Sequence, residues 1–262
     1  MQISFLKYEG AGNDFVMIDK FDYPDLTITP DIVQKICNRR FGVGADGLIT
    51  IEKDVNNEVD FIMHYYNGLL GDEAMCGNGA RCAVSFAKKC GYFENKKNDE
   101  IKFQAQGKIY KGKFIGDEVS IYFGDISFGD KYKNGYFIDT GCPHYVEIKN
   151  EDIDDFDLIP YSKEIRYSDD FQNGTNVNIV FKDSDVYKIR TYERGVEDET
   201  FACGTGAVAL ACVLGIDLQN DSKNTYKIKA RGGELFVSLK KTQNNFTDVW
   251  LTGPAVVTFE GI

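Results

Sequence analysis

The sequence is short of several residue types on which common classes of site depend. It holds two histidines, five prolines and one tryptophan among 262 residues, and its seven cysteines form no Cys-x-x-Cys pair. Structural zinc sites are built from closely spaced cysteines and histidines, so no metal site is expected. The full P-loop and Rossmann phosphate-binding patterns are missing as well, which argues against those two nucleotide-binding classes.

Long apolar runs and basic clusters are also absent. No run of about 18 apolar residues occurs, so no membrane span is expected, and Met1–Tyr8 is too short and mixed for a secretion signal. The formal net charge is -11, with Lys and Arg dispersed along the chain. Neither nucleic acid nor an anionic membrane is therefore an expected partner. An odd number of cysteines without a secretion signal favours reduced thiols and a cytoplasmic location.

Short alternating apolar segments, separated by Gly, Asn and Asp clusters, dominate the chain. This pattern predicts many strands joined by turns. The clearest are Leu48–Ile51, Val59–Tyr65, Val119–Phe123, Val177–Phe181, Val186–Tyr192, Leu235–Leu239 and Val256–Phe259.

Helical patterns are sparser. Thr29-Pro30-Asp31 reads as an N-cap followed by proline in the first turn of a helix. Two more helices are expected at about Gly77–Cys90 and Gly204–Leu214, stopped by Gly91 and Gly215. The last of these is apolar almost all round, which is typical of a helix buried on every side. With many strands nearby, we expect it inside a curled sheet.

The sequence repeats itself at about half its length. Cys76-Gly77-Asn78-Gly79-Ala80 returns as Cys203-Gly204-Thr205-Gly206-Ala207, an offset of 203 minus 76, or 127 residues. Asn67 lies 127 residues before Arg194, and Gly12–Val16 lies about 129 before Gly141–Val146. A repeat of this kind predicts a duplicated unit and two similar domains. We place them at 1–124 and 125–250, with residues 251–262 returning to the first.

Each repeated motif combines a cysteine with the start of a helix. The helix dipole lowers the pKa of a thiol at this position, and the exposed N–H groups of the first turn bind an anion such as a carboxylate. Two such units facing one substrate would place sulfurs on opposite sides of an α-carbon. One thiolate would remove the proton and the other thiol would return one, which inverts the carbon. Cys37, Cys82, Cys90 and Cys212 are instead expected to be buried and inert.

The motifs resemble the diaminopimelate epimerase family in order and across nearly the whole chain. The matching stretches are Gly10–Phe15, Gly42–Gly47, Met75–Cys82, Tyr192–Gly195, Glu199–Ala207, Gly232–Gly233 and Leu251–Ala255. The resemblance implies an α+β fold of two pseudo-symmetric domains, each a barrel-like, mostly antiparallel sheet curled around a central helix. It also implies an isomerase without a cofactor, a small amino-acid substrate, an active site between the domains and often a homodimer.

The resemblance also implies roles for individual residues. Cys76 and Cys203 look like the two bases, while Glu193 and His144 fall where the family places groups that assist them. The backbone N–H groups of the two helix starts look like the carboxylate cradle. By position in the family motifs, the substrate-binding set comprises Asn13, Asn67, Gly77, Asn78, Asn176, Glu193, Arg194, Gly204 and Thr205.

Three positions depart from the family pattern, and all lie in or near substrate-binding segments. Cys142 replaces the asparagine of Gly-Asn-Pro-His, Leu69-Leu70 replace a more polar stretch after Asn67, and Gly47 stands where some members carry a glutamine. Epimerisation of LL- to meso-diaminopimelate is the first hypothesis. Racemisation of another amino acid, such as histidine, or epimerisation of a thioether analogue of diaminopimelate is the second. A non-catalytic carboxylate-binding module is the third.

Overall fold

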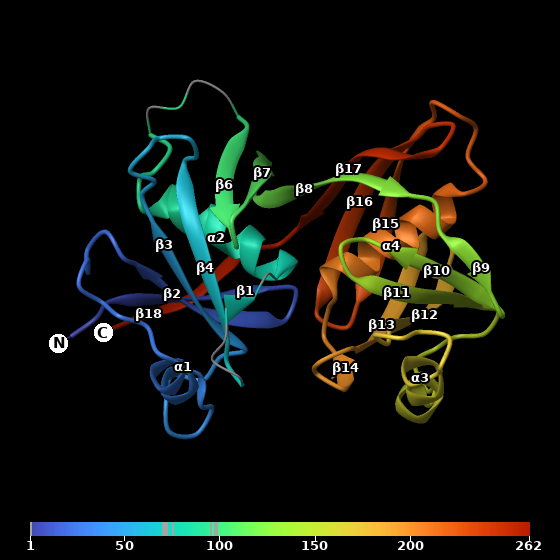
Figure 1. The fold of residues 1–262 in the computed structure, drawn as a ribbon, viewed down its shortest axis with the longest axis horizontal. Helices are drawn as coiled ribbons and strands as arrows, with labels where there is room; N and C mark the ends of the chain where they lie inside the picture. The colour runs from blue at the N-terminus through green and yellow to red at the C-terminus, as the bar shows by residue number, and fades with distance from the viewer. Residues whose placement is uncertain (1, 70–72, 75, 95, 97–98) are drawn as a thin grey trace. The chain divides into compact units, whose positions relative to one another are not determined.

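The computed structural model describes residues 2–69, 73, 74, 76–94, 96 and 99–262. The chain divides into two compact units, drawn in Figure 1. Unit 1 comprises Met1–Ile121 and Gly253–Ile262, and unit 2 comprises Tyr122–Thr252. These boundaries lie a few residues from those expected, and the C-terminal segment belongs to unit 1. Within the described residues, no helix is long and apolar enough to cross a membrane.

Unit 1 is a sheet whose strands follow the order β18-β1-β2-β3-β4-β6-β7-β8. The β2–β3 and β4–β6 pairs are parallel and the other pairs are antiparallel. A short β5 pairs with β4. The bounds are β1 Phe5–Gly10, β2 Asn13–Asp19, β3 Gly47–Glu52, β4 Phe61–Asn67, β5 Glu73–Ala74, β6 Ile101–Ala105, β7 Lys108–Ile115, β8 Glu118–Ser127 and β18 Val256–Gly261.

Unit 2 repeats this plan in the order β9-β10-β11-β12-β13-β15-β16-β17. Its parallel pairs are β11–β12 and β13–β15, and a short β14 pairs with β13. The bounds are β9 Asp130–Tyr132, β10 Gly135–Asp139, β11 Pro143–Lys149, β12 Asn176–Asp183, β13 Val186–Glu193, β14 Asp198–Thr200, β15 Lys223–Ala230, β16 Gly233–Lys241 and β17 Asn245–Gly253.

The two units correspond element by element, as the sequence repeat predicts. Unit 1 contains β1, β2, α1, β3, β4, β5 and α2 in chain order, and unit 2 contains β10, β11, α3, β12, β13, β14 and α4. The strand after the first helix lies parallel to the strand before it in both units, as β3 does to β2 and β12 does to β11. The outermost strand breaks the chain order. β18 completes unit 1 after the chain has passed through unit 2, whereas β9 forms the corresponding outer strand of unit 2 directly after β8, within which unit 2 begins. The predicted α+β architecture of two pseudo-symmetric domains is confirmed.

Each sheet wraps a central helix, which Figure 1 shows in the middle of its unit. α2 (Gly77–Lys89) contacts β1 through β4, and α4 (Gly204–Gly215) contacts β10, β11, β12, β15 and β16. α4 has no polar face because it is covered on every side, and ten of its twelve residues are buried. The sequence-based expectation of a buried apolar helix in a curled sheet is confirmed.

The predicted helix ends agree with the structure except at Gly215. Thr29 caps α1 (Pro30–Cys37) by accepting a hydrogen bond from Ile32 N, and Gly91 takes a positive φ of 80° just after α2. Gly215, predicted as a stop, is the last residue of α4, and Ile216 is the C-cap. A Cβ at Gly215 would lie 2.8 Å from Phe246 Cε1, so glycine is needed there for close packing.

The sequence reading missed α3 (Leu158–Arg166), which has a proline in its first turn and no side-chain cap bond at Asp157. It was also wrong about Cys90. Cys37, Cys82 and Cys212 are buried as expected, but Cys90 is exposed. As the C-cap of α2, Cys90 lies where the helix leaves the core.

Candidate active site

In unit 2, the strand order brings four of the predicted site residues to one edge. β11 and β12 are parallel, so both begin at this edge, with His144 opposite Asn176. β13 runs antiparallel to β12 and ends there at Glu193. The central helix α4 opens with Cys203 as its N-cap. The charge of Glu193 acts on Cys203, which places the carboxylate and the thiol in one neighbourhood.

Unit 1 forms the equivalent edge. β2 begins at Asn13, β3 begins at Gly47, and β4 ends at Asn67, which pairs with Gly47. Cys76 is the N-cap of α2, and its backbone is extended with φ -133° and ψ 120°. The repeat detected in the sequence therefore corresponds to two cysteines at the same structural position, one in each unit.

The Cys76 thiol has contacts on both sides of its sulfur. Sγ accepts from Gly79 N at 3.4 Å, as an N-cap side chain does, and it donates to Asn13 Oδ1 at 3.4 Å. Asn78 Nδ2 donates to the same oxygen at 3.3 Å. Asn13 is held in turn by Asp46, whose Oδ2 accepts from Asn13 Nδ2 at 2.6 Å. Asn13, Asn78 and Cys76 thus lie in contact with one another, with Asp46 behind them.

Four charged residues hold this arrangement in place, and the sequence reading gave none of them a role. Asp14 is paired with Lys7 at 2.6 Å and with Arg39 at 2.7 Å, and Arg39 also bridges to Asp46 at 2.6 Å. Burial opposes ionisation of Asp14, but the hydrogen bonds from Arg39 and Lys7 outweigh it and lower its pKa to about 2. The network fixes the start of β2, where Asn13 lies.

We predict that this network makes the protein sensitive to acid. The folded pKa of Asp14, about 2, lies below its ordinary value of 3.8. Its ionisation therefore contributes stability that is present above about pH 4 and is lost as the pH falls toward 2. Asp14→Asn should lower the free energy of unfolding by about 2 kcal/mol at pH 7 and by much less near pH 2. Urea unfolding of both proteins at several pH values measures this, and a pH-independent difference would contradict it.

Cys203 is the more enclosed of the two cysteines. Its exposed fraction is 8%, and Sγ lies 3.3 Å from Thr205 Oγ1. Burial raises the pKa of this thiol well above its ordinary value, and the charge of Glu193 acts in the same direction, whereas hydrogen bonds from Thr205 and Gly206 N oppose them. The thiol form is therefore favoured when no ligand is bound.

His144 reaches Cys203 only through another residue. The imidazole is fully buried, and Nε2 lies 2.9 Å from Thr205 Oγ1. Burial lowers the pKa of His144 to about 3, and the nearby charge of Arg194 acts in the same direction. The ring is neutral at physiological pH and contacts the hydroxyl that contacts Cys203. The structure therefore places His144 behind Thr205.

Asn176 and Arg194 are joined through the backbone. Asn176 Oδ1 accepts from Arg194 N at 2.8 Å, and its Nδ2 donates to Pro143 O at 2.9 Å. The amide of Asn176 thus holds the backbone at Arg194 and at Pro143 together at this edge. The Arg194 guanidinium donates through Nη1 to Asn173 O at 3.0 Å.

Both helix starts present backbone N–H groups. Gly77 and Asn78 open α2, and Gly204 and Thr205 open α4. N–H groups in a first helical turn find no carbonyl partner within their own helix, and the helix dipole adds positive charge. Each unit therefore carries, directly after its cysteine, a helix start of the kind that binds anions in proteins.

Comparisons with known proteins give the family. The sequence profile of diaminopimelate epimerases matches residues 5–118 and 136–258. The diaminopimelate epimerase of Flavobacterium psychrophilum is 41% identical over 261 residues, which cover 97% of each chain. That of Aquifex aeolicus is 36% identical over 99% of this chain and 97% of its own. The chain belongs to the diaminopimelate epimerase family. The predicted family and enzyme class, an isomerase, are confirmed.

The fold recurs in more distant proteins. A Bacillus anthracis phenazine biosynthesis protein of the PhzF family superposes with a TM-score of 0.75 at 14% identity, over 100% of this chain and 99% of its own. At this identity the likeness concerns the fold alone.

Two of the departures from the diaminopimelate epimerase pattern can be placed. A Cβ at Gly47 would lie 2.3 Å from Tyr65 Cε2 and 2.7 Å from Tyr66 O. The glutamine of some members therefore has no room unless both the Tyr65 side chain and the Tyr66 carbonyl move. Cys142 is partly buried, and burial raises the pKa of its thiol.

The third departure lies on the surface. Leu69 is 76% exposed, and its N–H donates to Asn67 Oδ1 at 2.9 Å. Its carbonyl accepts from Gln34 Nε2 at 3.1 Å. Leu70 lies outside the described residues. Asn67 thus directs the turn that follows β4.

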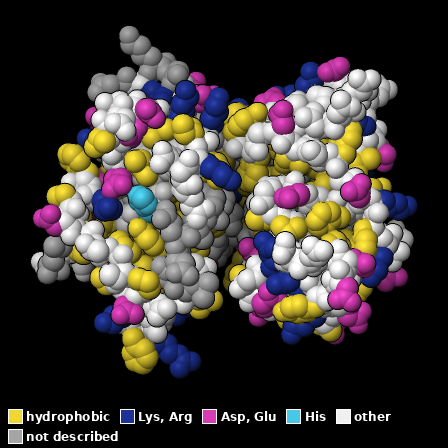
Figure 2. All heavy atoms as spheres, viewed as in Figure 1, with side chains coloured by type: hydrophobic (Ala, Val, Ile, Leu, Met, Phe, Trp, Pro, Cys, Tyr) yellow, Lys and Arg dark blue, Asp and Glu magenta, His cyan; other side chains and the backbone are white. Residues whose placement is uncertain are grey.

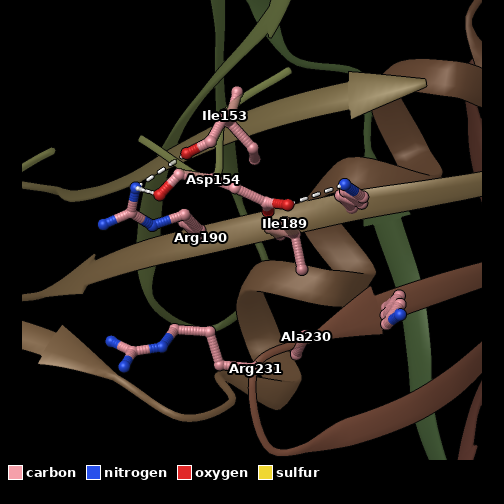
Figure 3. Close-up of a pocket in the computed structure, with 8 residues that line it drawn as sticks. Ile153, Asp154, Ile189, Arg190, Ala230 and Arg231 are labelled. Atoms are coloured by element: carbon pink, nitrogen blue, oxygen red, sulfur yellow. Dashed lines mark hydrogen bonds and ion pairs between the residues drawn. The ribbon is translucent and has the colours of Figure 1, made fainter. Parts of the chain in front are cut away.

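A groove of about 320 Å³ on unit 2 lies between the loop before α3 and the strands β13 and β15 (Figure 3). Two of its cations, Arg190 and Lys188, have partners. Arg190 donates to Ile153 O at 2.7 Å and Asp154 O at 3.2 Å, and it pairs with Glu199 at 2.7 Å. Lys188 pairs with Asp154 at 3.0 Å. These bonds hold the loop before α3 against β13, so Arg190 and Lys188 have a structural role in this groove.

The described surface mixes its charges. On the face drawn in Figure 2, Lys and Arg side chains alternate with Asp and Glu over both units. A polyanion requires a surface of one sign, and the described residues of this face do not provide one.

Proposed function

We propose that the chain converts LL-diaminopimelate to the meso form by moving a proton between Cys76 and Cys203. The observation that carries the proposal is the pair of equivalent cysteines, each the N-cap of the central helix of its unit. Sequence identity of 41% to a diaminopimelate epimerase over nearly the full chain supports the substrate. Inversion at one of the two α-carbons turns the LL isomer into the meso isomer.

The proposed reaction requires the two helix starts to share one α-carboxylate. Its negative charge grows as the α-carbon loses its proton, and fixed N–H donors stabilise that charge without reorganising. The C–H bond breaks on the side of one sulfur, which takes the proton, and the electron pair stays on carbon. A new C–H bond forms on the far side with the proton of the other thiol, which is left as a thiolate. No redox step or external proton is needed.

The environment of Cys203 suggests the order of the proton transfers. Burial and Glu193 raise its pKa well above the ordinary value, so it enters the cycle protonated. We assign Cys203 as the proton donor of the first half-reaction and Cys76 as the base. Arg194 has donors beyond the one bonded to Asn173 O. We assign it to a substrate carboxylate, because a guanidinium binds that group in bidentate fashion.

A deuterium-exchange screen tests this function. Reduced enzyme in deuterated water is expected to incorporate deuterium at the α-carbon of LL-diaminopimelate and to produce the meso isomer. L-Histidine and single-headed amino acids should exchange far more slowly. The absence of turnover with LL-diaminopimelate at saturating concentration would overturn the proposal. Turnover of histidine or of a thioether analogue in its place would favour the alternative substrates.

Two further expectations accompany the proposal. The reaction needs reduced thiols, which supports a cytoplasmic location, because the cytoplasm keeps thiols reduced. A disulfide between the two cysteines under oxidation would inactivate the enzyme. The homodimer implied by the family resemblance stays a prediction, and light scattering of the purified protein measures it directly.

A further inference from the structure

The two units differ in what lies beneath their central helices. In unit 1, a Cβ placed on Gly79 would meet Ile49 Cδ1 at 2.9 Å and Phe15 Cε1 at 3.5 Å. Gly79 therefore rests on two apolar side chains, one from β3 and one from β2. Neither of these two side chains can form a hydrogen bond toward the helix start.

In unit 2 the equivalent layer is polar. Gly206 is the counterpart of Gly79, and a Cβ there would meet Asn178 Oδ1 at 2.5 Å. β12 corresponds to β3 and β11 to β2, so Asn178 and His144 occupy the places of the apolar pair. Both are fully buried, with 0% exposure. Burying polar groups costs free energy unless each is hydrogen-bonded. The presence of this polar pair in unit 2 alone therefore points to a role specific to that unit.

The hydrogen bonds of Asn178 fix the orientation of its amide. Nδ2 donates to Tyr145 O at 2.8 Å, and Thr191 Oγ1 donates to Oδ1 at 2.9 Å. A backbone carbonyl only accepts, so the nitrogen must be the atom that faces Tyr145. Nδ2 also lies 3.1 Å from His144 Nδ1, and its second hydrogen donates to that ring nitrogen.

This orientation determines which nitrogen of His144 carries the proton. Nδ1 accepts from Asn178, so the neutral ring is protonated at Nε2. Nε2 donates to Thr205 Oγ1 at 2.9 Å. The Thr205 hydroxyl then has its own proton to donate to Cys203 Sγ, 3.3 Å away. Asn176 Nδ2 also lies 3.5 Å from Nε2, the longest contact of the set, and one of its two hydrogens is donated to Pro143 O.

We propose that Asn178 is a positioning residue that fixes the tautomer of His144 and thereby aims the Thr205 hydroxyl proton at Cys203 Sγ. This inference rests on the proposed function. The hydrogen bond stabilises the thiolate that remains each time Cys203 gives its proton to the substrate carbon. The charged and titratable neighbours of this chain of bonds are Glu193 and Cys142 beside Cys203, and Arg194 beside His144.

The first test reads the tautomer directly. The chain has two histidines, so a long-range proton–nitrogen correlation spectrum of ¹⁵N-labelled protein contains two sets of ring signals, and His64→Gln identifies those of His144. Wild type is expected to show His144 protonated at Nε2 alone. Protonation at Nδ1 would overturn the inference. The measurement needs no substrate, so failure of the proposed function leaves its outcome readable.

The second test uses variants. Asn178→Leu combined with Thr191→Val replaces the Asn178–Thr191 pair by apolar groups of similar size, so that the Thr191 hydroxyl is not left buried without its partner. It should release the His144 tautomer, lower kcat by about 10- to 100-fold with little change in KM, and shift the Cys203 limb of the pH profile upward. Thr191→Val alone is the matched control, because it leaves Nδ2 bonded to His144, and it should retain tautomer and kcat. An unchanged tautomer and kcat in the double variant would overturn the inference.

Thr205 gives an independent check if the double variant does not fold. Thr205→Val removes the hydroxyl and keeps the backbone N–H, so it should lower kcat by a similar factor while His144 stays at 0% exposure in a folded protein. Thr205→Ser restores a hydroxyl and should restore most of kcat. Equal activity of the serine and valine variants would show that the hydroxyl does not act on Cys203.

Discussion

Replacing Cys203 by alanine is expected to abolish inversion of LL-diaminopimelate, with a loss of about 10³-fold or more, while exchange of an α-proton continues from one face. General acid–base groups contribute about 10²–10⁴-fold each, and inversion needs both. Cys76 alone can remove a proton and return a deuteron to the same side. The variant should therefore label one stereoisomer without converting it. Cys76→Ala should show the same loss of inversion and label the opposite stereoisomer.

Mass spectrometry combined with chiral chromatography separates exchange from inversion in these variants. Cys212→Ala is a suitable control, because this cysteine is buried in the middle of α4 and faces no solvent. It should keep inversion at close to the wild-type rate if it folds normally. Inversion by either alanine variant at more than a tenth of the wild-type rate would contradict the two-base proposal. Labelling of the same stereoisomer by both variants would contradict the opposed placement of the sulfurs.

Arg194→Met is expected to lower kcat/KM by about 100-fold, mainly through KM. A bidentate bond between a guanidinium and a carboxylate is among the stronger hydrogen-bonded pairs in proteins, and a loss of about 2.7 kcal/mol corresponds to two orders of magnitude. Methionine keeps much of the side-chain volume. The backbone N–H of residue 194, bonded to Asn176 Oδ1, is unaffected, so the loop should hold its shape.

Steady-state kinetics with LL-diaminopimelate measure this effect, and Arg166→Met provides the comparison. Arg166 is also an arginine of unit 2, but it pairs with Glu197 at 2.7 Å. Loss of this ion pair should lower the stability of the protein and affect KM much less. A fall in kcat at unchanged KM for Arg194→Met would show that Arg194 acts on the reaction step and does not hold the substrate.

Most helices and strands could be predicted from the sequence, because the residues that determine each of them are neighbours in the chain. Thr29-Pro30 marked the start of α1, and the apolar run of α4 indicated its burial. α3 lacked such signals, since Pro160 lies in its first turn and Asp157 makes no capping bond. The boundary strands were harder, because the β1–β18 pairing joins the two ends of the chain.

The site was predictable where chemistry and repetition coincided, as at Cys76 and Cys203. Residues outside the matching motifs were missed. Asn178 follows Asn176 by two positions on one strand, so it points to the same face of the sheet, and this signal was available. Lys7 and Arg39 reach Asp14 from distant segments. These cations reach Asp14 only in the folded chain, so no local sequence pattern predicts the ion pairs.

The late return of β18 has a consequence for how the protein is made. The outer edge of β1 is covered by Val256–Gly261, which are synthesised after unit 2. While the chain is still on the ribosome, the first unit waits with an open strand edge, and open edges invite pairing with other chains. The second unit is contiguous in the chain and needs no later segment to complete its sheet. Unit 1 is thus made first but completed last. Its open strand edge is protected from aggregation only when Gly253–Ile262 have joined it.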